Sequence, residues 1–203
     1  MGFKQMVFIA IVAGSVPSAA LAQQALDPLN AAEIDLVRGA LLTNATVRQS
    51  LGASPRYAIV NVERHLEAKG AAPAGRRADV ILYNYATSET ISAVVSLAGA
   101  FRIDALRVTK DLPPPLGAAE AETAKQLALA NATVRTRLQA AGLSDSDPTL
   151  VVTHLFGRAE DPRDPCSRNR CVLLFFNSRT ALLFSAAVDL TENSVRAIDA
   201  PER

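Results

Sequence analysis

An internal repeat limits how this chain can fold. Residues 42–51 read Leu-Thr-Asn-Ala-Thr-Val-Arg-Gln-Ser-Leu, and residues 129–138 return to this pattern with Asn-Ala-Thr-Val-Arg unchanged, 87 residues further along. Later landmarks recur in the same order at slightly larger offsets, namely His65 with His154 and Asn84 with Asn177. Such self-similarity indicates two copies of one structural plan. A chain of 203 residues has room for both.

Each copy opens with a helical pattern. In the first copy, Asn30 and Glu33 have the spacing of a capping box at the start of a helix. Apolar residues then recur at helical spacing on one face of each predicted helix: Ile34, Val37 and Leu41 in the first copy, and Ala121, Ala124 and Ala128 in the second. The second stretch is rich in alanine, which favours helix formation.

The repeated Asn-Ala-Thr motif has two interpretations. Asn44 and Asn131 both match the N-glycosylation sequon, but asparagine is also a good helix cap. Because both copies carry the motif at the same place, the sequence favours a cap at which a second helix begins.

The remainder of each copy has the alternation of β-strands. Residues 91–97 and 184–190 alternate apolar with small or polar side chains in the same register. Further strands are expected at residues 57–64, 79–83 and 102–108 in the first copy and at 149–156, 171–176 and 194–198 in the second. We therefore expect an α+β fold of two tandem units, each a helix packed on an antiparallel sheet of about four strands.

A proline-rich segment separates the two units. Residues 111–117, Asp-Leu-Pro-Pro-Pro-Leu-Gly, form a semi-rigid spacer that cannot lie inside a helix or a central strand. The sequence thus predicts a first domain at residues 26–110, a linker at 111–117 and a second domain at 118–201.

Residues 1–22 have the pattern of a secretory signal peptide. Lys4 provides the positive start, residues 6–13 are an uninterrupted apolar run, and Ala-Leu-Ala at residues 20–22 forms the cleavage site. The apolar run is shorter than the roughly 20 residues of a membrane-spanning helix, so we expect no membrane anchor. The sequence predicts an exported protein, periplasmic or secreted, that begins near Gln23.

The charge balance gives no electrostatic preference for a partner. The chain has 21 basic and 20 acidic residues, and removal of Lys4 with the signal would leave a neutral protein. Nucleic-acid binding needs a basic field, and only 5% of the residues are aromatic. We therefore expect no nucleic-acid partner.

The two cysteines, Cys166 and Cys171, are separated by four residues. In an oxidising compartment this arrangement predicts a disulfide that closes a short loop. A redox pair or half of a metal site are the alternatives, but the spacing is not Cys-x-x-Cys, and no second group of cysteines and histidines lies nearby. A structural disulfide is the favoured interpretation.

The residues of ordinary catalysis are mostly missing. The chain has two histidines and no Gly-x-Ser-x-Gly motif, so nucleophilic catalysis has little support. His65 and His154 are expected at equivalent places, at the end of the first strand of each unit, which favours a shared structural role over a metal site between them. Near the central strands, Arg76, Arg77, Arg168 and Arg170 are interpreted as solvated charges, with a partner-contacting patch as the alternative.

Several segments carry a resemblance to a known family. Leu-Asp-Pro-Leu-Asn-Ala-Ala-Glu-Ile at residues 26–34, Arg-Arg-Ala-Asp-Val-Ile-Leu-Tyr-Asn at 76–84 and Ala-Val-Val-Ser-Leu at 93–97 resemble the first small N-terminal domain of the copper-dependent, topaquinone-containing amine oxidases. Residues 131–135, 142–143 and 187–199 resemble the next domain of those enzymes. The resemblance implies two cystatin-like helix-on-sheet domains, which in that family pack around a much larger catalytic β-sandwich.

The large catalytic domain has no counterpart in this sequence. The family makes its quinone from the tyrosine of an Asn-Tyr-Asp/Glu motif and holds copper with three histidines. Asn84-Tyr85-Ala86 lacks the acidic residue, and there is no His-x-His pair, so Tyr85 is interpreted as an ordinary turn or surface tyrosine. We expect no catalytic, cofactor-binding or metal-binding residue in this chain, and no catalysis by it alone.

Two hypotheses about function follow. In the first, the chain is a non-catalytic exported subunit of a split copper amine oxidase, and a separate catalytic polypeptide carries copper and topaquinone. In the second, it is a free-standing extracytoplasmic binding or inhibitory module with cystatin-like units. The Gln-x-Val-x-Gly signature of protease-binding cystatins is absent, which weakens the inhibitor version.

Overall fold

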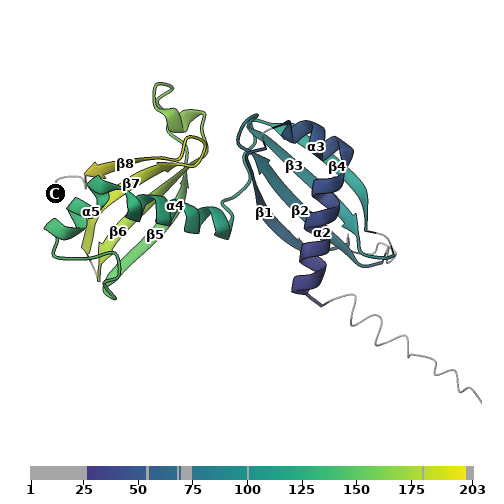
Figure 1. Cartoon of the computed structure of the whole chain (residues 1–203), viewed down its shortest axis with the longest axis horizontal. Coiled ribbons are helices and arrows are strands. Elements are labelled where there is room, and N and C mark those ends of the chain that lie inside the picture. Colours follow the sequence, from purple (N-terminus) through teal and green to yellow (C-terminus); the bar gives the residue numbers. More distant parts are fainter. Residues whose placement is uncertain are drawn as a thin grey trace, which may run out of the picture.

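A computed structural model describes residues 27–199, except residues 54, 68, 70–74, 100 and 180. The predicted signal peptide lies outside the described residues. Two tandem units follow one another along the chain, each with helices on one face of a four-stranded antiparallel sheet (Figure 1). The α+β fold class predicted from the sequence is confirmed.

The first unit contains two helices and one sheet. Its elements are α2 (Ala31–Thr43), α3 (Ala45–Leu51), β1 (Tyr57–Arg64), β2 (Arg77–Asn84), β3 (Glu89–Ser96) and β4 (Arg102–Lys110). The strands pair antiparallel in the order β1-β2-β3-β4. A β-bulge between Ile59 and Asn61 adds one residue, Val60, to the edge strand β1.

The second unit repeats this arrangement. Its elements are α4 (Ala118–Ala130), α5 (Ala132–Ala140), β5 (Leu150–Gly157), the 3-10 helix η1 (Pro165–Ser167), β6 (Cys171–Ser178), β7 (Ala181–Asp189) and β8 (Ser194–Asp199). The strands pair antiparallel in the order β5-β6-β7-β8. The strand positions expected from the sequence agree with these bounds to within a few residues.

The helix caps follow the sequence motifs. Asn30 and Glu33 form a complete capping box, in which each side chain accepts a hydrogen bond from the backbone N–H of the other residue. Asn44 accepts hydrogen bonds from the N–H groups of residues 46 and 47, and Asn131 does the same for residues 133 and 134. The interpretation of the repeated asparagine as a cap is therefore confirmed.

The two cores preserve the repeat at an offset of 87 residues in the helices. Four buried helical positions in the first unit match four in the second: Val37 with Ala124, Leu41 with Ala128, Val47 with Val134, and Leu51 with Leu138. Alanine occupies less space than valine or leucine, and the second sheet compensates with larger side chains. Phe176 and Phe184 stack there with ring centroids 4.7 Å apart. The cores therefore differ in content but use the same helix face.

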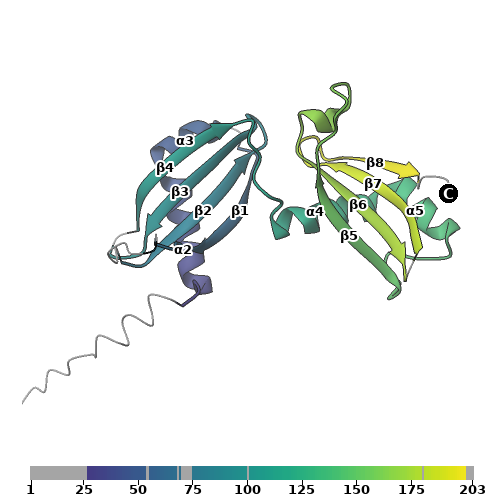
Figure 2. The ribbon, with the colours of Figure 1, turned by 180° about the vertical axis from the view of Figure 1, so that it is seen from behind.

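Both sheets have one covered and one uncovered face. The helices lie on the near side of both sheets in Figure 1, and Figure 2 shows the opposite faces from behind. Within the described part of the chain, no helix is both long and apolar enough to cross a membrane.

Candidate functional site at the joint between the two units

A buried ion pair lies where the second unit meets the linker. Arg170, directly before β6, donates from Nε to Oε1 of Glu120 and from Nη2 to Oε2, both at 2.6 Å. The Arg170 side chain is fully buried and that of Glu120 is 3% exposed. Arg170 also donates to the carbonyl oxygens of Pro114 and Pro115, both at 3.0 Å. These contacts fasten the linker and the start of α4 to the end of the second sheet.

The first unit contains the same arrangement. Arg76, directly before β2, donates to both carboxylate oxygens of Glu33, at 2.7 and 2.9 Å, and to the carbonyl oxygens of Asp27 and Pro28. In both units the glutamate is the third residue of the first helix and belongs to the N-terminal cap. The repeat therefore extends to an arginine that ties the helix start to the central strand.

The first unit covers the Arg170–Glu120 pair of the second unit. The hydroxyl of Tyr85, which follows β2, donates to Oε1 of Glu120 at 2.6 Å. The guanidinium of Arg170 lies over the rings of Tyr83 and Phe156, at 4.7 and 5.1 Å from their centroids. Such cation–π contacts add to the attraction where the charge is removed from water. The Arg170–Glu120 pair, together with Tyr83 and Tyr85 of the first unit, thus forms a contact region between the two units, which we call the joint.

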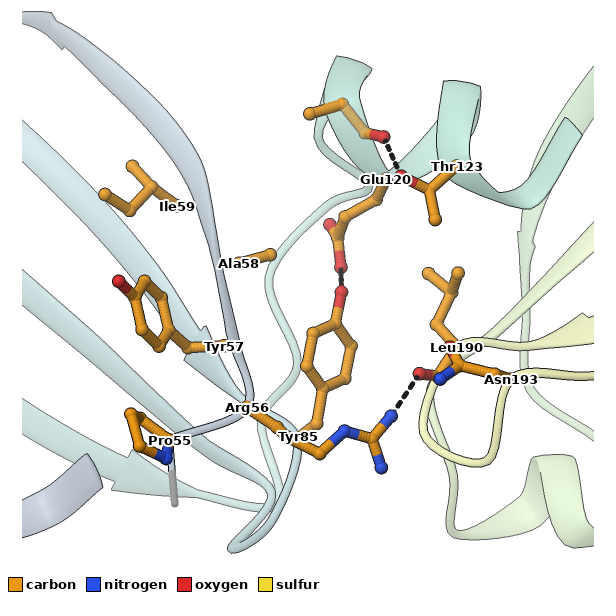
Figure 3. Close-up of a pocket in the computed structure, with 11 residues that line it drawn as sticks. Pro55, Arg56, Tyr57, Ala58, Ile59, Tyr85, Glu120, Thr123, Leu190 and Asn193 are labelled. Carbon is orange, nitrogen blue, oxygen red and sulfur yellow. Dashed lines mark hydrogen bonds between the residues drawn. The ribbon is translucent and has the colours of Figure 1, made fainter. Parts of the chain in front are cut away.

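Two further contacts cross the joint. Arg56 donates from Nη2 to the carbonyl oxygen of Leu190 at 3.3 Å (Figure 3). Gly117, the cap residue of α4, lies so close to β1 that a Cβ atom built on it would be 2.9 Å from the carbonyl oxygen of Val60. The bulge of β1 is therefore in direct contact with the residue at which α4 begins.

The pKa values at the joint follow from these contacts. Burial alone would raise the pKa of Glu120, but hydrogen bonds from Arg170, Tyr85 and the Gly117 N–H outweigh burial and hold that pKa below its usual range. Burial raises the pKa of the Tyr85 phenol far above its ordinary value, and its hydrogen bond to the negative Glu120 raises it further. Glu120 therefore stays charged and Tyr85 stays protonated.

The stability of the second unit should consequently fall in acid. A carboxyl group whose pKa is lowered on folding contributes stability above its unfolded pKa, 4.5 for a free Glu, and loses it as the pH falls through the folded value. We expect Glu120→Gln to flatten the dependence of unfolding free energy on pH below about 4.5. Urea unfolding at several pH values measures this, and an unchanged slope would contradict it.

A groove lies beside the joint. Its volume is about 430 Å³, and it is lined by residues of β1 and the segment before it, by α4 and by the β7–β8 turn (Figure 3). Polar groups from both units reach it, including Arg56, Tyr85, Glu120 and Asn193. Glu120 is already bound by Arg170 and Tyr85, so its carboxylate has no free role in proton transfer. The groove can hold a small molecule, but its charged side chains, Arg56 and Glu120, already make hydrogen bonds within the contact region between the units.

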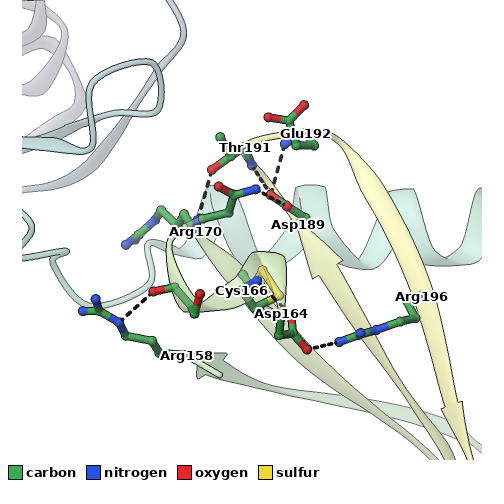
Figure 4. Close-up of a disulfide and its surroundings, with 11 residues drawn as sticks. Arg158, Asp164, Cys166, Arg170, Asp189, Thr191, Glu192 and Arg196 are labelled. Carbon is green, nitrogen blue, oxygen red and sulfur yellow. Dashed lines mark hydrogen bonds and ion pairs between the residues drawn. A yellow bond between two sulfur atoms is a disulfide. The ribbon is translucent and has the colours of Figure 1, made fainter. Parts of the chain in front are cut away.

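The predicted disulfide between Cys166 and Cys171 is present and supports the same joint (Figure 4). Cys171 is the first residue of β6 and directly follows Arg170. Asp164 accepts a hydrogen bond from the Cys166 N–H at 2.9 Å and pairs with Arg196 of β8 at 2.6 Å. The disulfide therefore closes the loop that places Arg170 against Glu120.

Reduction of this disulfide should loosen the joint more than it unfolds the chain. A loop of this length gives an entropic stabilisation of about 2 kcal/mol. We expect mass spectrometry to find Cys166 linked to Cys171 in exported protein, and hydrogen exchange after reduction to increase first in residues 158–170. Two free thiols in freshly isolated exported protein would contradict the prediction.

The structure corrects three expectations from the sequence. Arg170 is buried and paired, not solvated, because the linker and the first unit cover it, while Arg168 is exposed. Tyr85 does lie in the turn after β2, but it faces the second unit and not the solvent. Arg76 and Arg77 are both paired, Arg76 with Glu33 and Arg77 with Glu67.

The two histidines do not occupy equivalent places. His65 follows β1 opposite Arg77, and its Nδ1 lies 2.8 Å from Oδ1 of Asp79. His154 lies within β5, opposite Leu174. The expected equivalence was wrong because the connection between α5 and β5 is longer than that between α3 and β1, so that His154 has the place of Val62 in the first sheet. Among the described residues, no three side chains of His, Cys, Asp or Glu are grouped as metal ligands.

The purified chain should bind no stoichiometric copper. The copper of the family that this sequence resembles needs three histidines, and the whole chain has two, in different units. The residues present therefore do not fit a copper–quinone centre. Metal analysis after removal of loosely bound ions measures this, and one tightly held copper per chain would overturn it.

Sequence reasoning missed the roles of Glu120 and Gly117, and it named Arg170 without its buried pairing. The signal was available, because the 87-residue offset aligns Asp-Pro-Leu-Asn-x-x-Glu at residues 27–33 with Pro-Pro-Leu-Gly-x-x-Glu at residues 114–120. Only the capping box of the first copy was identified. Applying the offset to Glu33 would have identified Glu120 as its equivalent.

Comparisons with known proteins place the fold but not the activity. No family model and no curated protein matches the sequence. The fold is similar to that of a copper-containing benzylamine oxidase from Hansenula polymorpha, with a TM-score of 0.56 and 14% identity over 85% of this chain. The chain spans 29% of the length of that protein's chain. The resemblance found in the sequence is thus supported at the level of a related fold.

Proposed function

We propose that this chain is a non-catalytic, exported subunit of a split copper amine oxidase, which completes a separate catalytic polypeptide in the oxidative deamination of primary amines. The observation that carries the proposal is the likeness of both units, in tandem, to a copper-containing benzylamine oxidase over 85% of the chain. In this proposal, residues 26–110 and 118–201 act as the small N-terminal domains of the enzyme. The partner supplies copper and topaquinone.

The contacts at the joint support the proposed subunit role, because they favour one orientation of the two units relative to each other. Arg170 binds Glu120 and the linker carbonyl oxygens, Gly117 approaches Val60 of the first unit, and Tyr85 of the first unit binds Glu120. A buried pair of this kind is a weak source of net stability, because desolvation offsets most of the attraction. Its use here is to specify one relative orientation, as a subunit that fits a larger partner requires.

The disulfide supports the proposed location. Disulfides form and persist in oxidising compartments and are rare in the cytosol. Together with the signal-like residues 1–22, the Cys166–Cys171 bond favours a periplasmic or secreted protein.

Affinity capture from the native host tests the proposal. The tagged chain should co-purify from the exported fraction with a larger polypeptide that contains copper, stains for a quinone and releases hydrogen peroxide when a primary amine is added. Capture of the chain alone in repeated experiments would contradict the proposal.

The groove at the joint favours a second candidate, the free-standing binding module. Its volume of about 430 Å³ suits a small molecule, and groups from both units line it. In this case the captured chain should carry a small ligand and no oxidase, which native mass spectrometry would detect.

A further inference from the structure

The uncovered faces of the two sheets differ in chemistry, although both lie on the same side of the molecule (Figure 2). Strand pairing places Glu63 beside Asp79, and Ile81 between Asn61 and Ser92, on the face of the first sheet opposite its helices. An uncovered antiparallel face is expected to be polar in this way. Val94 and Ala105 lie in the same row as Glu63 and Asp79, so the apolar residues of this face are interspersed with charged and polar ones.

The second sheet carries apolar side chains on the corresponding face. Strand pairing places Leu155 beside Leu173, and Phe175 in a row with Ser185 and Ile198. None of these apolar residues belongs to the described core cluster of the second unit. Leu155 and Val151, which lie on the same face of β5 on either side of Thr153, are 58% and 48% exposed. Polar groups border this apolar cluster, namely Thr153 on β5 and the Arg196–Asp164 ion pair at the β8 side. An exposed apolar cluster with a polar rim marks an interaction surface.

Strand β5, at the edge of this sheet, is also unprotected. Proteins usually protect edge strands with charged residues or bulges, because the unpaired backbone groups can bind another strand. Strands β1 and β4 each have both a bulge and charged residues, and β8 has charged residues and is short. By contrast, β5 has the sequence Leu-Val-Val-Thr-His-Leu-Phe-Gly, without an acidic or basic residue other than the histidine, and pairs with β6 without a register shift.

The area of the face indicates what covers it. Eight residues at about 3.4 Å and four strands at about 4.8 Å give a face of roughly 500 Å². Two copies stacked through this face would bury about 1,000 Å² in total, whereas stable interfaces bury about 800 Å² on each partner. A permanent contact needs a partner that extends beyond the face onto the β5 edge, and a larger polypeptide can do so.

We propose that the outer face of the second sheet, together with the edge of β5, is the surface by which this chain binds the catalytic polypeptide. This inference rests on the proposed function and names its interface. The partner presents an apolar surface to Leu155, Leu173 and Phe175 and places a strand beside β5. The polar face of the first sheet stays in water.

Leu155→Lys tests this surface, and Leu36→Lys is its matched control. Both leucines are exposed, at 58% and 52%, but Leu36 lies on α2 of the first unit, away from the proposed surface. Neither change should alter the melting temperature of the free chain appreciably. We expect Leu155→Lys to lower the recovered copper-containing polypeptide at least tenfold and Leu36→Lys to leave it unchanged. In the wild-type complex, hydrogen exchange should slow in β5 and not in β1.

The outcomes separate the two proposals. Equal recovery with Leu155→Lys and with the control would overturn this surface while the subunit role stands. A wild-type chain that captures no copper-containing polypeptide would overturn the subunit role and this inference with it. Light scattering that shows a dimer of the free chain, broken by Leu155→Lys, would assign the face to a second copy and overturn the inference.

Discussion

Replacing Arg170 with methionine should lower the unfolding free energy of the second unit by about 3–5 kcal/mol. The change leaves the buried Glu120 carboxylate without its two charged hydrogen bonds and frees the carbonyl oxygens of Pro114 and Pro115. Urea unfolding measures the loss. Adding Glu120→Gln to Arg170→Met should recover part of it, because the uncompensated buried charge is then removed.

Arg76→Met is the matched control for this change. Arg76 makes the equivalent four hydrogen bonds in the first unit, but the side chains of Arg76 and Glu33 are 18% and 20% exposed, so water compensates part of the loss. We expect a cost of about 1 kcal/mol. Equal costs for the two substitutions would show that burial at the joint adds nothing to the pair.

Replacing Gly117 with valine should separate the two units and cost about 3 kcal/mol, the upper end for overpacking. The backbone at Gly117 has φ −78°, which any residue adopts. The cost therefore comes mainly from the side chain, whose Cβ would lie 2.9 Å from the Val60 carbonyl oxygen and 3.1 Å from its Cα. Because these are backbone atoms, the units themselves must move. Small-angle X-ray scattering should show a longer and more variable molecule.

Gly39→Val is the control for the added bulk. Gly39 lies in α2, and a Cβ built on it meets nothing within 4 Å. Valine and glycine differ by only a few tenths of a kcal/mol in helix propensity, so stability and scattering should barely change. If Gly117→Val leaves the scattering curve of the folded protein unchanged, the close approach to Val60 does not set the angle between the units.

The repeat explains why the fold could be predicted from the sequence. Local signals determine most of the elements: the Asn30–Glu33 capping box, the caps at Asn44 and Asn131, and the alternation in the strands. Each of these depends on residues within a few positions of one another, so sequence spacing alone identifies them. The short loop between Cys166 and Cys171 likewise made the disulfide predictable.

The joint could not be predicted because its contacts are long-range. Arg170 and Glu120 are 50 residues apart, and Tyr85 and Glu120 are 35 apart. Whether an arginine before a strand is solvated or buried depends on what packs over it, and the first unit supplies that cover only in the folded chain. Arg76 and Arg170 have the same local setting, but only Arg170 becomes fully buried.

The chemistry of the two outer sheet faces could not be predicted from the sequence either. β5 and β6 are rich in apolar residues at successive positions, so the sequence predicts strands there but does not distinguish a core face from an apolar outer face. Strand pairing resolves them by placing Leu173 and Phe175 opposite Leu155 and Thr153, away from the helices. A joint held by many contacts and an outer face rich in apolar residues are the two features that the proposed subunit role requires.

Peroxide release in a host that lacks this chain tests the subunit role most directly. Deleting its coding sequence, while the catalytic polypeptide is still produced and exported, should reduce amine-dependent hydrogen peroxide release in the exported fraction to background. Adding the purified wild-type chain should restore the release, and the Leu155→Lys chain should restore at most a tenth of it. Undiminished peroxide release without this chain would contradict the account.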